Sequence, residues 1–140
     1  MQQPLFREIT RTFIGTEVSI FRAMFMNKPA REGTHLVWHQ DRSTDLNMDP
    51  QITVWTALDD STVENGCVNI LPGSHRRLIN PEHSSGFLTE EQTEEGLLEG
   101  NPVDLEVEKG ETVLLHNWML HSSGVNRTDV ARRAFSVCYM

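Results

Sequence analysis

A histidine and an aspartate two residues apart, His39 and Asp41 in the segment LVWHQD, are the first side chains that could do chemistry together. The segment is typical of an extended strand, in which alternate side chains project from the same face. His39 and Asp41 therefore share one face, whereas Trp38 and Gln40 take the other. The pair could ligate a metal ion or could be an ordinary surface His–Asp pair, and so short a motif does not decide between them.

A third ligand could come from the C-terminal segment HNWMLHSSGVNRTDVARR, which offers His116 and His121. Two imidazoles and one carboxylate on one face of a metal ion leave three adjacent positions open, an arrangement suited to Fe(II) and dioxygen. A keto acid would chelate two of these positions, and its distal carboxylate would need an anchor. The planar fork of an arginine suits that task best, and Arg132 is a candidate, although taken alone it could equally be an ordinary arginine at a strand end.

Spacing alone does not choose between the two histidines, because eleven residues separate His121 from Arg132 and also His116 from Arg127. Their surroundings favour the first pair. His116 ends the apolar run TVLLH, whereas His121 opens HSSGVN, whose small and polar residues allow a polar ligand to approach closely. Arg127 falls in an expected turn, whereas Arg132 begins the last apolar strand, where packing can hold it rigid.

These side chains must be positioned by strands, because most of the chain reads as short strands separated by turns. Apolar residues at helical spacing predict a helix over residues 5–14, with Gly15 as its C-terminal cap. A second helix is expected over residues 89–98, where Thr89 and Gln92 have capping-box spacing. The expected strands are residues 17–26, 36–41, 52–58, 67–71, 103–107, 112–116 and 133–139. Seven short strands with few helices predict an antiparallel sandwich or barrel.

Length and composition fit one soluble globular domain. The chain has 140 residues, of which 38% are hydrophobic and 23% charged. No apolar stretch approaches the roughly 20 residues of a membrane span, and charged residues interrupt the N-terminal region where a secretory signal would lie. We therefore expect a cytoplasmic protein that does not associate with membranes. Cys67 and Cys138 lie in apolar runs without C-x-x-C spacing, which favours buried, reduced thiols over a disulfide.

Charge is unevenly distributed along the chain. The formal net charge is -8, and residues 82–111 hold ten acidic residues against one base, Lys109. The remainder is close to neutral, which argues against a nucleic-acid surface and permits a small anionic ligand away from the acidic segment. We interpret the acidic segment as a solvated loop or helix.

Four segments in order, WHQD, ITVWTALDDSTVENGCVNILPGSH, GETVLLH and HSSGVNRTDVARRAFSVCYM, resemble the phytanoyl-CoA dioxygenase (PhyH) family of Fe(II)- and 2-oxoglutarate-dependent oxygenases. The resemblance runs from about Phe21 to the C-terminus. It implies a mainly all-β fold, the double-stranded β-helix or cupin-like jelly roll, with one or two short helices. Members of the family usually have a further region before the segment matched here, so we expect residues 1–140 to form a single, N-terminally shortened domain.

The resemblance also implies roles for individual residues. His39, Asp41 and His121 match the metal ligands, and Arg132 matches the arginine that binds the far carboxylate of 2-oxoglutarate. Two further residues match positions that line the cosubstrate, Ser123 and Trp55. Asn126 fits a residue that supports the loop after the distal histidine. His75 belongs to a PGSH turn, where we expect it to structure the loop rather than to ligate metal.

The implied activity uses Fe(II), 2-oxoglutarate and dioxygen to hydroxylate an unactivated C–H bond of a small organic substrate, with release of succinate and carbon dioxide. In halogenating relatives a small residue replaces the ligating carboxylate, so Asp41 favours hydroxylation. A non-catalytic or fragmentary jelly-roll binding domain that retains the metal motif remains the alternative. A cupin-like isomerase or hydrolase would not require Arg132 or HSSGVN. The sequence does not indicate the substrate or the oligomeric state.

Overall fold

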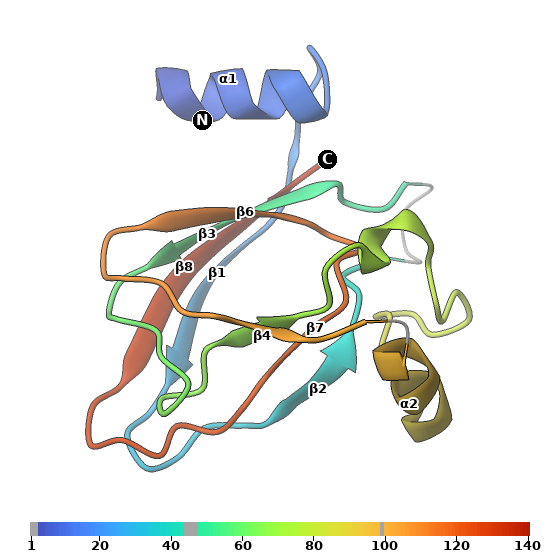
Figure 1. Ribbon diagram of the computed structural model, residues 1–140. Helices are drawn as coiled ribbons and strands as arrows, with labels where there is room; N and C mark the ends of the chain where they lie inside the picture. Colours follow the sequence, from blue (N-terminus) through green and yellow to red (C-terminus); the bar gives the residue numbers. More distant parts are fainter. Residues whose placement is uncertain (1–2, 44–47, 99) are drawn as a thin grey trace.

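Two four-stranded antiparallel sheets enclose the interior of the computed structural model, which describes residues 3–43, 48–98 and 100–140 (Figure 1). The first sheet has the strand order β1-β8-β3-β6 and the second β2-β7-β4-β5. The strands of the first sheet are β1 (Ile20–Lys28), β8 (Arg132–Tyr139), β3 (Ile52–Ala57) and β6 (Thr112–His116). Those of the second are β2 (Leu36–His39), β7 (His121–Ser123), β4 (Val68–Ile70) and β5 (Val103–Leu105). The predicted mainly β, jelly-roll architecture is confirmed.

Alternation along β8 shows how the sequence builds the interior face of the first sheet. Arg132, Ala134, Ser136 and Cys138 are buried, whereas the intervening Arg133 and Phe135 are exposed. Central strand β3 is buried on both faces, because Trp55 and Ala57 pack into one apolar cluster and Ile52 and Val54 into another. One face of each long strand therefore points into the interior, where the candidate site lies.

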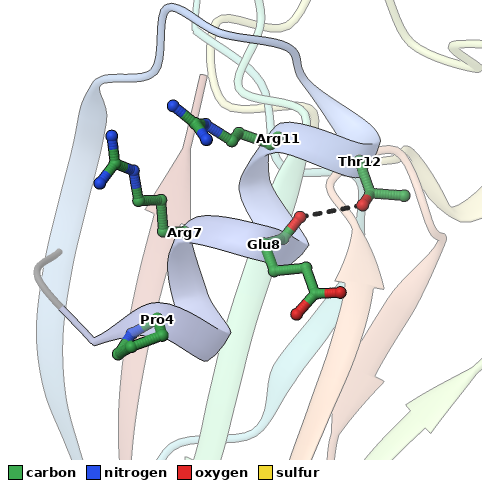
Figure 2. Close-up of a pocket in the computed structure, with 5 residues that line it drawn as sticks. All are labelled: Pro4, Arg7, Glu8, Arg11 and Thr12. Atoms are coloured by element: carbon green, nitrogen blue, oxygen red, sulfur yellow. Dashed lines mark hydrogen bonds between the residues drawn. The ribbon is translucent and has the colours of Figure 1, made fainter.

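Helix α1 (Pro4–Phe13) covers part of the outer face of the first sheet (Figure 1). Proline in the first helical turn loses no intrahelical hydrogen bond there, and Phe6, Ile9 and Ile14 pack against the cluster of Ile52, Val54 and Tyr139. Figure 2 shows a shallow hollow on α1, where Arg7 and Arg11 project and Thr12 donates a hydrogen bond to the Glu8 carbonyl. The expected end of the helix is confirmed, with Gly15 following at a positive φ of 129°.

Helix α2 (Glu90–Leu98) confirms the second helical prediction. The Gln92 backbone N–H donates to Thr89 Oγ1 over 3.1 Å, and the Thr89 N–H donates to Gln92 Oε1 over 3.0 Å. Its acidic side chains at Glu90, Glu91 and Glu94 are exposed, as expected of a solvated acidic segment. A single-turn 3₁₀ helix, η1 (Ser74–Arg76), follows the Pro-Gly turn.

The structure corrects three strand predictions. His121–Ser123 forms strand β7, which pairs with both β2 and β4 although its small polar residues carry no strand signal. Strand β1 covers 20–28 rather than 17–26. Strand β2 ends at His39, because the Gln40 N–H bonds to the Gly86 carbonyl and the Asp41 N–H to the Asn117 carbonyl.

Two other features bear on the sequence expectations. Cys67 and Cys138 are buried, free thiols, as predicted. Within the described ranges, no helix has the length and apolar character needed to cross a bilayer.

Candidate metal centre

Strand pairing brings the candidate metal ligands together. His39 ends β2 and His121 begins β7, and the two are register partners whose ring centroids lie 4.1 Å apart. Asp41 lies two residues beyond His39, just past the end of the strand. One ligand atom from each of the three residues lies within 4.8 Å of those from the other two. The H-x-D pair and His121 therefore form one compact cluster.

Hydrogen bonds orient both imidazoles for metal binding. Nδ1 of His39 donates to the Val37 carbonyl over 2.8 Å, and Nδ1 of His121 donates to the Met119 carbonyl over 2.8 Å. Since a carbonyl can only accept, the proton sits on Nδ1 and Nε2 keeps its lone pair, the arrangement of metal-bound histidines. Burial, together with neighbouring His121, lowers the pKa of His39 to about 4, which keeps its ring neutral and ready to ligate.

The residues around His39 fix its position. The Phe87 ring stacks on the imidazole, with centroids 4.9 Å apart and planes inclined by 24°. Gly86 allows this approach, because it has a φ of 69° and a Cβ there would clash with the Gln40 carbonyl oxygen. Fully buried Gln40 donates to the Arg77 and Trp118 carbonyls over 2.8 and 2.7 Å and accepts from the Ile79 N–H over 2.7 Å. The residue between the two H-x-D ligands is thus held from three sides.

Asp41 makes an ion pair with a residue that the sequence analysis did not single out. Arg22 of β1 donates through Nη2 to Asp41 Oδ1 over 3.2 Å. Burial lowers the pKa of Arg22, but the Asp41 carboxylate and Cys138 together outweigh it and raise the pKa above its ordinary value. A carboxylate has two oxygens, so Asp41 can hold Arg22 with one and present the other to a metal.

The types and arrangement of these donor atoms fit a divalent transition metal. Two neutral imidazole nitrogens and one carboxylate oxygen converge from one side, as in sites that bind Fe(II) and leave open positions. Those positions would face a cavity of about 510 Å³ whose lining includes all three residues. His39, Asp41 and His121 could therefore hold such an ion with room beside it for further ligands.

The same cavity is lined by the three residues expected to bind the cosubstrate. Arg132 begins β8, is only 2% exposed, and donates through Nη2 to the Gly66 carbonyl over 2.6 Å. Its guanidinium carbon lies 5.8 Å from the Trp55 ring centroid. Arg132 Nε and Trp55 Nε1 are buried and have no hydrogen-bond partner among the described residues. Ser123, at the end of β7, is also buried there. The structure thus brings Arg132, Ser123 and Trp55 into one chamber with the triad.

Lys28 is a further cation that sequence reasoning missed. It is the register partner of Arg132, is 9% exposed, and lines the same cavity. Its Nζ donates to the Thr34 and Gly124 carbonyls, each over 2.6 Å. Burial and nearby Arg132 lower the pKa of Lys28 to about 8. No motif marks it in the sequence, and it lies two residues beyond the end of the expected strand 17–26.

The other two histidines considered in the sequence analysis, His116 and His75, lie outside the triad. His116 ends β6 outside the triad, accepts a hydrogen bond at Nδ1 from the Trp118 N–H, and lies 5.2 Å from the His75 ring. His75 is not part of the triad. That His75 structures its loop stays a prediction: Ser74 makes the hydrogen bonds across the turn, and His75 Nδ1 is buried without a partner in the part of the chain described. Asn126 confirms its loop role by bonding Lys28, Thr128 and Val130.

Comparison with known proteins identifies the family. Residues 1–134 match the sequence profile of phytanoyl-CoA dioxygenase (PhyH). The chain belongs to the PhyH family. Among curated relatives, phytanoyl-CoA dioxygenase 1 of Oryza sativa subsp. japonica is 34% identical over 125 residues, covering 85% of this chain and 43% of the relative. A PhyH domain-containing protein 1 homologue of Dictyostelium discoideum is 35% identical, covering 84% and 44%. This PhyH chain spans about half the length of the curated relatives it matches.

Solved structures agree on the fold. EctD from S. alaskensis, solved with 2-oxoglutarate and 5-hydroxyectoine, has a TM-score of 0.79 at 24% identity, covering 99% of this PhyH chain and 52% of its own. SnoK, described as a non-heme alpha-ketoglutarate-dependent carbocyclase from nogalamycin biosynthesis, has a TM-score of 0.73 at 25% identity, covering 88% and 50%. The non-heme monooxygenase ThoJ in its Ni complex has a TM-score of 0.72 at 27% identity, covering 99% and 50%.

Proposed function

We propose that this PhyH-family chain holds the centre of an Fe(II)- and 2-oxoglutarate-dependent dioxygenase that hydroxylates an unactivated C–H bond of a small organic substrate. The observation that carries the proposal is the convergence of His39, Asp41 and His121 within 4.8 Å, on a cavity that also contains buried Arg132. Family membership and 2-oxoglutarate-dependent neighbours support the same chemistry.

Each residue has a role in this proposal. His39, Asp41 and His121 would hold Fe(II), which when bound supplies dioxygen activation at the expense of 2-oxoglutarate, with succinate and carbon dioxide as products. Arg132 binds the distal carboxylate of the cosubstrate through its planar fork, and the Trp55 ring and Ser123 hydroxyl border that carboxylate. Because Arg132 is buried, water competes little for its charge, which strengthens the interaction.

The ligand set also bears on the reaction type. Asp41 supplies a carboxylate at the position that a small residue takes in halogenating relatives, so no ligand position is vacated for halide. Phe87 and the Gln40 hydrogen bonds hold His39 next to it. These features favour hydroxylation over halogenation.

Aerobic turnover tests the proposal. Purified protein is incubated with Fe(II) and 2-oxoglutarate, with or without a metal chelator, against a panel of acyl thioesters, free acids and small metabolites, and succinate is measured. We expect succinate formation to require Fe(II), to stop when chelator is added, and to increase when a compound of the panel is a substrate. Tight binding of Fe(II) and 2-oxoglutarate without succinate from any mixture would instead support the non-catalytic binding domain.

A further inference from the structure

A row of polar side chains crosses the interior face of the first sheet beside the metal centre. Arg22 of β1 and Thr53 of β3 are both register partners of Cys138 on β8. The Thr53 hydroxyl lies 3.0 Å from Cys138 Sγ and donates to Asn117 Oδ1 over 3.2 Å. Asn117 follows β6, and its carbonyl accepts the Asp41 N–H over 2.8 Å. The row therefore ends on both sides against Asp41, once through Arg22 and once through Asn117.

Each end of this row holds a buried N–H donor without an acceptor among the described residues. Arg22 uses Nη2 for Asp41, while its Nε is buried without a partner among the described residues. Asn117 is 2% exposed and uses Oδ1 for Thr53, while its Nδ2 is buried and equally unpartnered within the described ranges. Both residues line the cavity that contains the triad. Buried donors without acceptors are costly, so two of them beside one cavity indicate a ligand that supplies acceptor atoms.

Charge in the cavity identifies the kind of acceptor. The whole chain carries -8, yet the described lining places four cationic side chains against the single carboxylate of Asp41, namely Arg22, Lys28, Arg42 and Arg132. A positive cavity in an acidic protein selects anions.

Three of these cations are engaged elsewhere. Arg42 pairs with Asp49 over 3.8 Å, and Lys28 is bonded to two carbonyls. Arg132 is the proposed cosubstrate anchor. Arg22 remains as the cation beside the metal centre: it gives Nη2 to Asp41, and its buried Nε has no partner among the described residues.

We infer that Arg22 and Asn117 bind a carboxylate group of the substrate next to the metal centre, so that the substrate of the proposed oxygenase is a carboxylic acid. This inference rests on the proposed function and names its substrate class. A planar carboxylate matches an edge of the guanidinium, and Asn117 Nδ2 adds a donor from the other end of the row. Arg22 thereby determines specificity while still holding Asp41.

Binding of matched acids and amides tests the inference. Protein loaded anaerobically with Fe(II) and saturated with 2-oxoglutarate, so that the cosubstrate anchor is filled, is titrated by calorimetry with hexanoate and phenylacetate. The same sample is titrated with hexanamide, phenylacetamide and hexyl phosphate. We expect a carboxylate to bind at least about tenfold more tightly than its amide, as loss of a charged hydrogen bond implies.

Two variants and a control locate the effect. Arg22→Gln should remove the preference for acid over amide by weakening acid binding about tenfold or more. Asn117→Asp, which places a like charge at the site, should also weaken acid binding. Arg11→Gln removes the same charge from the exposed hollow of α1 and should change neither affinity (Figure 2).

The outcomes are decisive. The inference would be overturned if both acids failed to bind at millimolar concentration, or if acid and amide bound equally. It would also be overturned if Arg22→Gln left the acid affinity unchanged, or if hexyl phosphate bound more tightly than hexanoate. Binding of Fe(II) and 2-oxoglutarate is measured on the same samples. Their failure to bind would contradict the proposed function, whereas their binding without acid selectivity would contradict only the substrate class.

Discussion

Replacing Arg132 with lysine separates the charge of the proposed anchor from its shape. The guanidinium already gives Nη2 to the Gly66 carbonyl, and its buried Nε remains unused among the described contacts. Lysine keeps the positive charge but has no planar fork, so one charge-assisted hydrogen bond to the distal carboxylate of 2-oxoglutarate is lost. Such a bond contributes about 1.5–3 kcal/mol, which corresponds to a roughly 10- to 150-fold rise in the 2-oxoglutarate Kd.

Calorimetric titration of 2-oxoglutarate into the anaerobic, Fe(II)-loaded Arg132→Lys variant measures this change. Arg133→Lys is the matched control, because Arg133 is the next residue on β8, is exposed, and pairs with Asp59 outside the cavity. We expect its Kd for 2-oxoglutarate to stay at the wild-type value. An unchanged Kd in a folded Arg132→Lys variant would refute the assignment of the anchor, and Lys28, its register partner, would be tested next.

Three other predictions concern stability and the choice of ligand. Burial and nearby Arg132 hold the pKa of Lys28 at about 8 in the folded state, against 10.5 for an ordinary lysine, so the charged form opposes folding. The free energy of unfolding should therefore rise from pH 8 to 10.5, and Lys28→Met should remove that part of the slope in chemical denaturation. Gly86→Ala should lower the free energy of unfolding by about 1–3 kcal/mol, because of the positive φ and the clash with the Gln40 carbonyl; an unchanged denaturation midpoint would contradict this account. His121→Ala should abolish iron-dependent succinate formation, whereas His116→Ala should lower stability modestly and retain turnover; the reverse pattern in folded variants would exchange their roles.

The local parts of the fold could be predicted because they depend on neighbouring residues. The capping box at Thr89 and Gln92 is a three-residue motif, and the alternation that places Arg132 inside and Arg133 outside is a property of one strand. The pairing of His39 with Asp41 was also predicted from alternation, although β2 ends at His39 and Asp41 lies just beyond it. Local sequence was therefore sufficient for most element positions and for half of the candidate site.

Long-range pairing explains what sequence could not predict. His121–Ser123 is a strand only because β2 and β4 lie on either side of it, and its residues have no strand propensity of their own. Arg22 and Lys28 reach the cavity through the register of β1 with β8, and Asn117 through its bond to Asp41. Local surroundings and family resemblance indicated His121 and Arg132, whereas the places of Arg22, Lys28 and Asn117 depend on how the strands pair.

Iron binding tests the central claim most directly. Anaerobic titration of the purified protein with Fe(II) should show about one ion per chain, and an Asp41→Ala variant should bind more weakly because the anionic ligand is lost. A His39→Ala, Asp41→Ala double variant should lose specific binding while its folded state, followed by circular dichroism, is retained. Equal Fe(II) affinity in the wild type and the folded double variant would contradict the assignment of this triad as the metal centre.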